Sequence, residues 1–272
     1  ITAESGVSGI TLKGAASQLN LSTVNVSAAV STLTAISSLG GGVRVFDAND
    51  STGRTLVGSS DGDTLSGFGG DDIFQMGGGR DTLSGGDGDD TFQIAAASDI
   101  TSGIDLSGGN GTDSLVLTST SISALEFPFQ TASFATLENF DLSGGAASGV
   151  SMTMSGDRLA EISTFLGDGT SDSINVFTDS FNARGVTFNG IEQINLTETI
   201  SSNPDNPGTF QRLEINSSTS ITGLDVVSGT VDSNGSLDDA VEVSGDRDFS
   251  GITFTNINEF DLSDGSGVRQ TI

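Results

Sequence analysis

The stretch GSSDGDTLSGFGGDDIFQMGGGRDTLSGGDGDDTFQ, residues 58–93, decides the fold because it repeats every nine residues. It divides into four tandem units, and a fifth nonapeptide unit follows a spacer. An aspartate holds the sixth position and a large apolar residue the eighth position of every unit. Chance periodicity in a glycine and acid linker is the alternative, but it leaves this regularity unexplained. The units are 58–66, 67–75, 76–84, 85–93 and 108–116.

Each nonapeptide unit predicts a tight turn followed by a short strand. Glycines supply the positive φ values that a tight turn needs, and the last three residues form a short strand whose middle side chain is apolar. Leucine and phenylalanine alternate from unit to unit, so residues 18 apart are alike. This pattern predicts a coil with two strands on opposite faces, in which Leu65 stacks over Leu83 and Phe74 over Phe92.

Composition limits the possible functions. The chain has 272 residues, of which 34% are hydrophobic, enough for the core of one long all-β domain or two ordinary ones. Its 36 acids, 9 bases and net charge of -27 repel nucleic acid, which excludes nucleic-acid binding. No apolar run approaches the ~20 residues of a membrane span, so no transmembrane segment is predicted. No basic segment followed by an apolar run stands at the N-terminus, so we expect either a processed or truncated chain or an export signal elsewhere.

Catalysis is not expected from this sequence. Histidine and cysteine are absent, which removes imidazole bases, thiolate nucleophiles, disulfides and the usual zinc sites. Acidic pairs such as Asp71/Asp72 and Asp238/Asp239 are the remaining candidates, as glycosidase carboxylates. The chain lacks the tryptophan and tyrosine that most often stack on sugars, and adjacent acids on turns more often bind calcium or face solvent. We therefore predict that the protein is not an enzyme.

The nonapeptide units resemble the RTX (repeats-in-toxin) family, whose motif is Gly-Gly-x-Gly-x-Asp-x-U-x with U large and apolar. The resemblance implies a calcium-binding parallel β-roll that holds several Ca²⁺ ions. Calcium takes six to eight oxygen ligands, and a glycine-rich turn can direct carbonyls inward beside the sixth-position carboxylate. One turn supplies half of such a cage. We therefore expect Asp63 to pair with Asp81 across coils at one edge, and Asp72 with Asp90 at the other.

The resemblance also implies a set of calcium ligands. The carboxylate ligands are the sixth-position residues Asp63, Asp72, Asp81, Asp90 and Asp113. The carbonyl ligands come from the first, third and fifth positions of the turns, which are Gly58, Ser60, Gly62, Gly67, Gly69, Asp71, Met76, Gly78, Arg80, Gly85, Asp87, Asp89, Gly108, Asn110 and Thr112.

Several residues depart from the family motif. Ser59, Ser60 and Phe68 replace glycine or small residues, Met76 holds a first position, and Asp61 stands where a left-handed glycine is usual. Aspartate tolerates that conformation better than most residues. Phe68 puts the calcium half-site of its own turn in question.

A second and longer repeat follows the nonapeptide units. Residues 132–143, 186–197 and 252–263 share an aromatic residue, an aliphatic residue three positions later and a strand that ends in Leu-Ser/Thr. They align Phe134 with Phe188 and Phe254, and predict three cycles of roughly sixty residues that extend one solenoid core. Ordinary β-sandwich alternation is the alternative. The predicted regions are a joining segment (1–48), a β-roll (49–117) and a continuing solenoid (118–272).

Helical patterns are few. Residues 156–167 place Leu159, Ile162 and Leu166 on one helical face, with Gly167 as a C-cap, which predicts a short helix. Residues 27–42 fit either state and are interpreted as a second short helix. The predicted fold class is thus all-β, a right-handed parallel β-roll and β-solenoid with calcium-binding turns and one or two short helices.

The resemblance implies a bacterial protein that leaves the cell unfolded by type I secretion and folds in extracellular calcium. We expect a structural protein of the cell surface that assembles with itself into an S-layer lattice or filament, with a cell-surface polysaccharide as a further partner. The first alternative is a C-terminal RTX module of a type I secreted enzyme, toxin or adhesin. The second is a ligand-binding adhesin, which would need an exposed aromatic groove.

Overall fold

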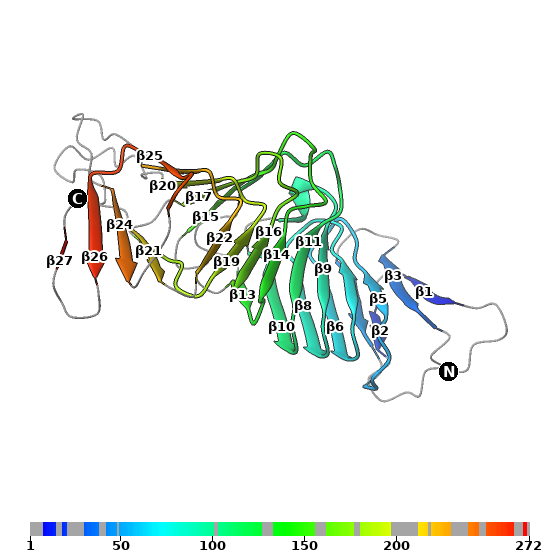
Figure 1. The fold of residues 1–272 in the computed structure, drawn as a ribbon. Helices are drawn as coiled ribbons and strands as arrows, with labels where there is room; N and C mark the ends of the chain where they lie inside the picture. The colour runs from blue at the N-terminus through cyan, green and yellow to red at the C-terminus, as the bar shows by residue number, and fades with distance from the viewer. Residues whose placement is uncertain are drawn as a thin grey trace, which may run out of the picture. The chain divides into compact units, whose positions relative to one another are not determined.

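The computed structural model describes residues 8–14, 18–20, 30–37, 42–47, 49–100, 103–126, 133–155, 162–176, 180–196, 212–216, 219–229, 239–244, 249–263 and 269–270. The chain forms two compact units: unit 1, Ile1–Ile122 with Phe127–Gly144, and unit 2, Ser123–Glu126 with Gly145–Ile272. Nearly all described elements are strands in stacked parallel sheets (Figure 1), so the predicted all-β solenoid class is confirmed.

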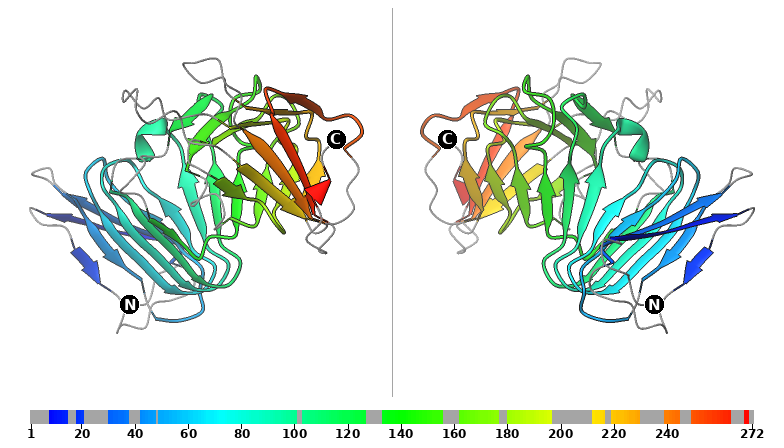
Figure 2. Two further views of the ribbon diagram at one scale, coloured as in Figure 1. Left: turned by 90° about the vertical axis from the view of Figure 1, so that its left-hand side faces the viewer. Right: turned by 90° about the vertical axis from the view of Figure 1, so that its right-hand side faces the viewer.

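Unit 1 contains two parallel sheets that the chain visits alternately. The strands of each sheet run alongside one another (Figure 2). The first sheet contains β1 (Gly9–Gly14), β3 (Thr32–Ser37), β5 (Thr55–Val57), β7 (Ile73–Gln75), β9 (Thr91–Ile94), β11 (Ser114–Leu117) and β14 (Asn139–Asp141). The second contains β2 (Gln18–Asn20), β4 (Arg44–Phe46), β6 (Thr64–Gly69), β8 (Thr82–Asp87), β10 (Asp105–Asn110) and β13 (Ser133–Ala135).

The core of unit 1 consists of the two predicted stacks. Leu65 pairs in register with Leu83, and Phe74 with Phe92, whose rings stack with centroids 4.7 Å apart. All four side chains are buried. Residues outside the nonapeptide units continue the stacks, because Val45 lies opposite Leu65 and Leu56 lies opposite Phe74. The apolar eighth position of each unit therefore supplies one buried side chain per strand.

Unit 2 contains three groups of paired strands. The first is β12 (Ala124–Glu126), β15 (Ser151–Met154), β17 (Ser173–Val176), β20 (Gln193–Leu196), β23 (Val226–Ser228) and β25 (Thr253–Thr255). The second is β16 (Thr164–Leu166), β19 (Thr187–Asn189) and β22 (Ser220–Thr222). The third is β18 (Ser180–Asn182), β21 (Arg212–Asn216), β24 (Ala240–Ser244), β26 (Glu259–Ser263) and the antiparallel β27 (Arg269–Gln270).

The longer repeat forms corners between sheets rather than equivalent positions in one stack. Within unit 2, Phe188 lies in β19 beside Phe165, whereas Phe254 lies in β25 opposite Val227. Successive coils in this sheet are 33 and 27 residues long, since Gln193 pairs with Val226, which pairs with Thr253, so two coils fall within sixty residues. The aligned residues of the longer repeat do not stack on one another, because the repeat follows the turn from one sheet to the next.

Both predicted α-helices are wrong where the structure describes them. Residues 32–37 form strand β3, and residues 164–166 form strand β16, whereas 27–29, 38–41 and 156–161 lie outside the described residues. β3 is paired on both sides, by β1 and β5, so sheet pairing overrides a marginal helical pattern. One 3₁₀ turn, η1 (Ala97–Asp99), lies in the spacer. In the described part of the chain, no helix is long and apolar enough to cross a membrane.

Candidate metal sites at the turns

Two rows of turns join the sheets of unit 1. The lower corner, at the bottom of Figure 1, leads from the second sheet to the first through the turns at 49–54, 70–72, 88–90, 111–113 and 136–138. The upper corner leads from the first sheet to the second and includes 58–63 and 76–81. Each turn stacks on the equivalent turn of the next coil because the flanking strands are parallel and in register.

The sixth-position aspartates form a ladder of hydrogen bonds between coils. At the lower corner the Asp72 backbone N–H donates to Asp90 Oδ1 (2.8 Å), and the Asp90 N–H donates to Asp113 Oδ1 (2.8 Å). At the upper corner the Asp63 N–H donates to Asp81 Oδ1 (2.9 Å). All five side chains are buried, with exposed fractions of 0–2%. The structure thus makes the expected pairs, Asp63 with Asp81 and Asp72 with Asp90, neighbours across coils.

The second carboxylate oxygen distinguishes these residues from ordinary buried acids. Within the described residues, the Oδ2 atoms of Asp72, Asp81, Asp90 and Asp113 are buried and have no hydrogen-bond partner. Asp63 differs, because its Oδ2 accepts the Ser59 N–H. An unpaired buried carboxylate oxygen is costly unless a cation or a donor compensates it. These atoms are therefore the strongest structural indication of a ligand.

The unpaired oxygens point into small spaces that we call cradles. A cradle lies between a first-position glycine, the aspartate Oδ2 of the same turn and the first-position carbonyl of the next coil. A Cβ added to Gly85 would stand 2.0 Å from Asp90 Oδ2 and 2.5 Å from Gly108 O. Any side chain at this position would clash with both oxygens, so the glycine leaves them accessible to a ligand. The oxygen donors and their convergence fit a calcium ion.

Gly67 repeats this arrangement, and Gly58 repeats it with an aspartate oxygen that also accepts the Ser59 N–H. At Gly67 an added Cβ would lie 2.1 Å from Asp72 Oδ2 and 2.8 Å from Gly85 O. At Gly58, in the upper corner, the corresponding distances are 2.6 Å to Asp63 Oδ2 and 2.3 Å to Met76 O. The first-position carbonyls of Met76, Gly85 and Gly108 are thus the predicted carbonyl ligands that the geometry brings to the aspartates.

Other predicted carbonyls lie in the same rows but have different neighbours. The third-position carbonyls of Asp87 and Asn110 accept the Gly70 and Gly88 N–H groups, at 2.8 and 2.9 Å. The fifth-position carbonyls point at the preceding coil, where Asp71 O would lie 2.1 Å from a Cβ on Gly53 and Arg80 O 2.6 Å from one on Gly62. The third-position carbonyls of Asp87 and Asn110 therefore already accept a backbone hydrogen bond between coils, which any ligand would have to share.

Burial raises the pKa of the aspartates that form the ladder. Loss of solvation raises the pKa of Asp72 to about 8 and that of Asp81 and of Asp90 to about 7, and neighbouring carboxylates add to each shift. Burial also raises the pKa of Asp63 and of Asp113. Without a cation these carboxyls tend to hold protons near neutral pH, so a bound cation and a proton compete for the same oxygens.

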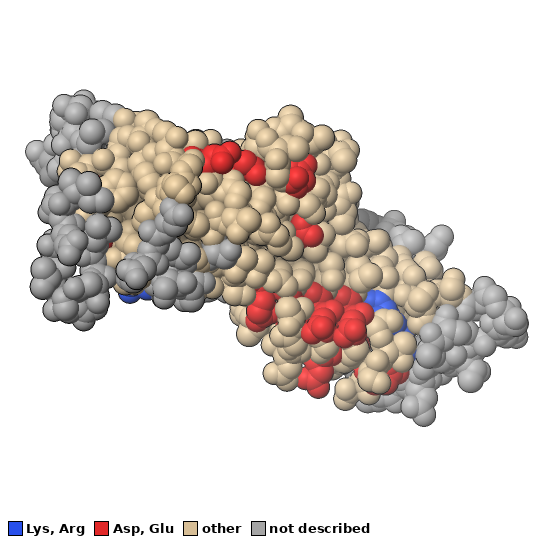
Figure 3. Space-filling view, viewed as in Figure 1, with Lys and Arg blue, Asp and Glu red and all other residues tan. Residues whose placement is uncertain are grey.

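A second, exposed ladder lies outside the first at the lower corner. The Asp89 N–H donates to Asp71 Oδ1 (2.9 Å), and the Thr112 N–H donates to Asp89 Oδ1 (2.8 Å). Figure 3 shows acidic side chains gathered in this lower part of unit 1. Stacked carboxylates repel each other, so this corner favours cation binding both inside and outside the turn.

Arg54 holds the place of a sixth-position aspartate one coil before Asp72. Its backbone N–H donates to Asp72 Oδ1 (2.7 Å), which is the same bond that Asp72 makes to Asp90. Its side chain has an exposed fraction of 0% and contacts Asp47 Oδ1 at 3.0 Å and Asp50 Oδ1 at 3.1 Å. Nε also donates to Val30 O (3.1 Å). A guanidinium thus compensates the buried carboxylate of Asp47 and the partly exposed carboxylate of Asp50 at the start of this row.

Sequence analysis missed several residues with related positions. Glu138 accepts the backbone N–H of Asp113 (2.8 Å), and Glu192 accepts that of Asp172 (2.7 Å). Within the ladder the aspartate of the next coil accepts this bond, as Asp90 does from Asp72. Asp172 is buried at the sixth position of the turn 167–172, GDGTSD. Its nonapeptide spacing was the signal available. The two glutamates lie outside any nonapeptide unit, but they hold the same position of the longer repeat, which was the signal that could have marked them.

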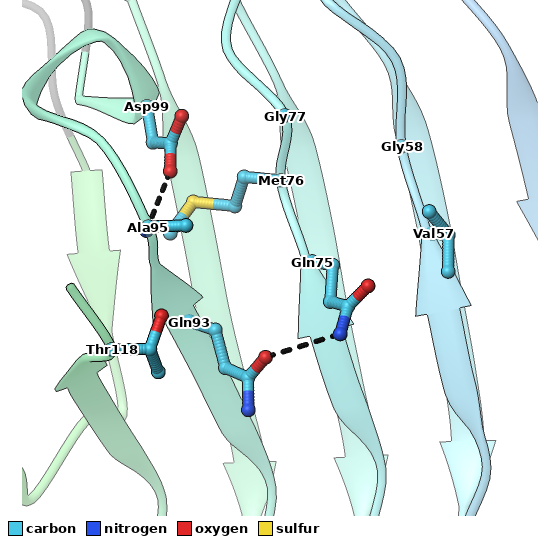
Figure 4. A pocket seen from close by; sticks show the side chains of 9 residues that line it. All are labelled: Val57, Gly58, Gln75, Met76, Gly77, Gln93, Ala95, Asp99 and Thr118. Carbon is cyan, nitrogen blue, oxygen red and sulfur yellow. Dashed lines mark hydrogen bonds between the residues drawn. The ribbon is translucent and has the colours of Figure 1, made fainter.

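Clusters of three or more His, Cys, Asp or Glu side chains suited to a metal do not occur among the described residues. Each cradle instead joins one carboxylate to a backbone carbonyl, and such sites depend on main-chain oxygens. A separate hollow of about 340 Å³ lies beside the ends of β7 and β9 (Figure 4). Gln75 Nε2 donates to Gln93 Oε1 there (3.3 Å), and the Asp99 carboxylate accepts the Ala95 N–H (2.7 Å).

Fold and turns together define a parallel β-solenoid with carboxylate-lined corners. Comparison of the chain with protein-family models, with curated proteins and with solved structures finds no match. The function is therefore inferred from the geometry of these turns.

Proposed function

We propose that the chain is a calcium-dependent structural protein of a bacterial cell surface, in which Ca²⁺ ions between the coils hold the β-roll together. The observation that supports this most is the set of four buried, unpaired carboxylate oxygens, on Asp72, Asp81, Asp90 and Asp113. Uncompensated buried charge of this kind opposes folding at neutral pH. A cation bound beside each of these oxygens removes the penalty.

Calcium suits these donors better than other metals. The cradles contain carboxylate and carbonyl oxygens, and the chain has no histidine or cysteine to favour zinc or copper. Magnesium prefers a compact octahedral shell and keeps its waters, whereas calcium accepts many oxygens in irregular geometry. The net charge of -27 also favours a folding step that depends on added positive charge.

Assembly into a lattice or filament is the second part of the proposal. Among the described strands of unit 1, β1 and β2 lie at the edges of their sheets. Unpaired strand edges are templates for pairing with another chain. If two copies of the solenoid stack end to end, backbone hydrogen bonds between edge strands continue both sheets, and no particular side-chain contact is needed. This agrees with the extracellular setting and type I secretion that resemblance to the RTX family implies.

A calcium titration of chelated protein tests both parts. Circular dichroism measures folding and light scattering measures assembly, with magnesium titrated separately. We expect β-structure and then large particles with calcium alone. Asp90→Ala should raise the calcium concentration needed, whereas Asp105→Ala, which removes an exposed acid on β10, should not. Complete folding in chelator would refute the calcium part. Folding to a stable monomer would refute self-assembly and favour the module of a larger secreted protein.

A further inference from the structure

We propose that the lower corner holds one more calcium site, beyond the pairs of nonapeptide turns, in which Asp113 is joined by the Thr136 carbonyl and positioned by Glu138. This inference rests on the calcium binding proposed above. It adds a site whose second half comes from the coil that follows the last nonapeptide unit.

Asp113 presents the same unpaired oxygen as the earlier aspartates. Its side chain has an exposed fraction of 0%, and Oδ1 is occupied by the Asp90 N–H at 2.8 Å. Oδ2 is buried without a hydrogen-bond partner in the described structure. A Cβ added to Gly108 would stand 2.2 Å from this Oδ2 and 2.1 Å from Thr136 O. The cradle of the earlier turns is thus repeated with a carbonyl from outside the repeat.

Thr136 has a conformation that suits this role. Its φ of 53° lies in the left-handed region, which is strained for a residue other than glycine. The hydroxyl Oγ1 accepts the Gly109 N–H (2.7 Å) and donates to Ala135 O (2.7 Å), which fixes the turn. Because Gly109 donates to Thr136, its N–H does not satisfy the nearby Asp113 Oδ2. The turn therefore leaves this oxygen for another ligand.

Glu138 continues the ladder in place of an aspartate. Its Oε2 accepts the Asp113 N–H at 2.8 Å, as Asp113 Oδ1 accepts the Asp90 N–H. Two carboxylates thereby face each other across the coil boundary, and their repulsion is relieved by a divalent cation. We assign Glu138 a positioning role, because its contact is to the backbone of the ligand residue.

Isothermal titration calorimetry with calcium chloride on the chelated full chain tests the site. Asp113→Asn keeps an oxygen for the Asp90 N–H but removes the charge, and we expect it to bind one ion fewer per chain than the wild type. Glu138→Gln keeps the acceptor and should weaken one ion about tenfold. Asp105→Asn, on the exposed face of β10, is the matched control and should bind the wild-type number of ions.

Gly108→Ala provides a variant that leaves every carboxylate in place. Its Cβ would occupy the cradle, so the same single ion should be lost. If circular dichroism shows that this variant does not fold in calcium, the Asp113→Asn stoichiometry decides. Unchanged stoichiometry and affinity in Asp113→Asn and Glu138→Gln, with an ion lost in Asp90→Asn, would overturn this site alone. A wild-type chain that binds no calcium would overturn the proposed function itself.

Discussion

The turn at 108–113 in unit 1 and the turn at 167–172 in unit 2 use the same arrangement with different results. In both, a buried aspartate receives a backbone N–H from the coil before it and donates its own N–H to a glutamate on the coil after it. In both, the second oxygen faces a carbonyl of the next coil, Thr136 O or Gly190 O. Yet Asp172 Oδ2 accepts the Asp168 N–H at 2.9 Å, whereas Asp113 Oδ2 has no such donor.

The two turns also differ in the residue that faces position two from the neighbouring coil. Position two of the turn is Gly109 in unit 1 and Asp168 in unit 2. In unit 1 the hydroxyl of Thr136 accepts the Gly109 N–H, while in unit 2 the equivalent residue is Gly190, which has no side chain. The Asp168 N–H bonds within its own turn. A buried carboxylate can thus be satisfied by its own loop or left to bind a cation.

The largest expected effect is a different response of the two units to calcium removal. We expect chelation to lower amide protection of Ser114, which follows Asp113, by roughly a thousandfold, because one ion at high excess contributes about 4 kcal/mol. The amide of Ser173, which follows Asp172 and donates to Val150 O at 2.8 Å, should change little. Hydrogen exchange followed by mass spectrometry measures both. Equal loss at the two sites would break the comparison.

Arg54 tests whether a built-in cation replaces a metal ion. Arg54→Met leaves the buried Asp47 without its guanidinium, so we expect a loss of about 3–5 kcal/mol in the free energy of unfolding. The loss should be similar in chelator and in calcium. Denaturant unfolding measures it.

The control for Arg54→Met is Arg184→Met. Arg184 also contacts two carboxylates, those of Glu214 and Glu242, but its side chain is 37% exposed. A loss below about 1 kcal/mol is expected there. If both variants lose the same stability, burial is not what makes the Arg54 contacts strong.

The pH dependence of the chelated protein should have an unusual sign. Asp72, Asp81 and Asp90 have folded pKa values raised from 3.8 to about 8, 7 and 7, so the folded state holds more protons than the unfolded state between those limits. Stability in chelator should therefore fall as pH rises from about 5 to about 8. With saturating calcium this fall should be abolished or reversed. Thermal unfolding in the two buffers checks it, and rising stability in chelator would contradict the assignment.

The smallest effect is expected when each unit receives the residue that the other unit has at this corner, through Thr136→Gly in unit 1 and Gly190→Thr in unit 2. Thr136→Gly removes the hydroxyl that holds the Gly109 N–H and relieves a left-handed threonine, so unit 1 should gain about 1 kcal/mol in chelator. Gly190→Thr, at a φ of 70°, should cost unit 2 about 1–2 kcal/mol. Denaturant unfolding in chelator compares them. A loss of stability in Thr136→Gly would show that the hydroxyl does more for the turn than the strain costs.

Much of unit 1 could be predicted because its repeat is local and regular. The nine-residue period placed Leu65 over Leu83 and Phe74 over Phe92, and it identified the five aspartates that the structure buries in ladders. Phe68 was the residue in question, and it does adopt a left-handed φ of 69° where the next units have glycine. The turn accommodates the strain, since Phe68 stays paired with Gly86.

Prediction was less successful where equivalent residues come from different coils of unequal length. The longer repeat was aligned correctly as a sequence, but Phe188 and Phe254 lie in different sheets because the pattern describes a corner. The left-handed residues Thr136, Gly190 and Asn256 occupy the same place in this pattern, with φ values of 53°, 70° and 56°. Only one of them is the residue type that normally signals such a turn.

The sequence by itself determined the period, the alternation of strand and turn, and the residue types that line the corners, because each depends on neighbours within a few positions. Tertiary structure decided which carboxylate oxygens remain unpaired. Asp113 and Asp172 both hold the sixth position of a glycine-containing turn, yet only Asp172 Oδ2 accepts an N–H of its own turn, while the Gly109 N–H donates to Thr136 on the next coil. Hydrogen bonds between coils form only after the strands are in register, so local sequence cannot specify them.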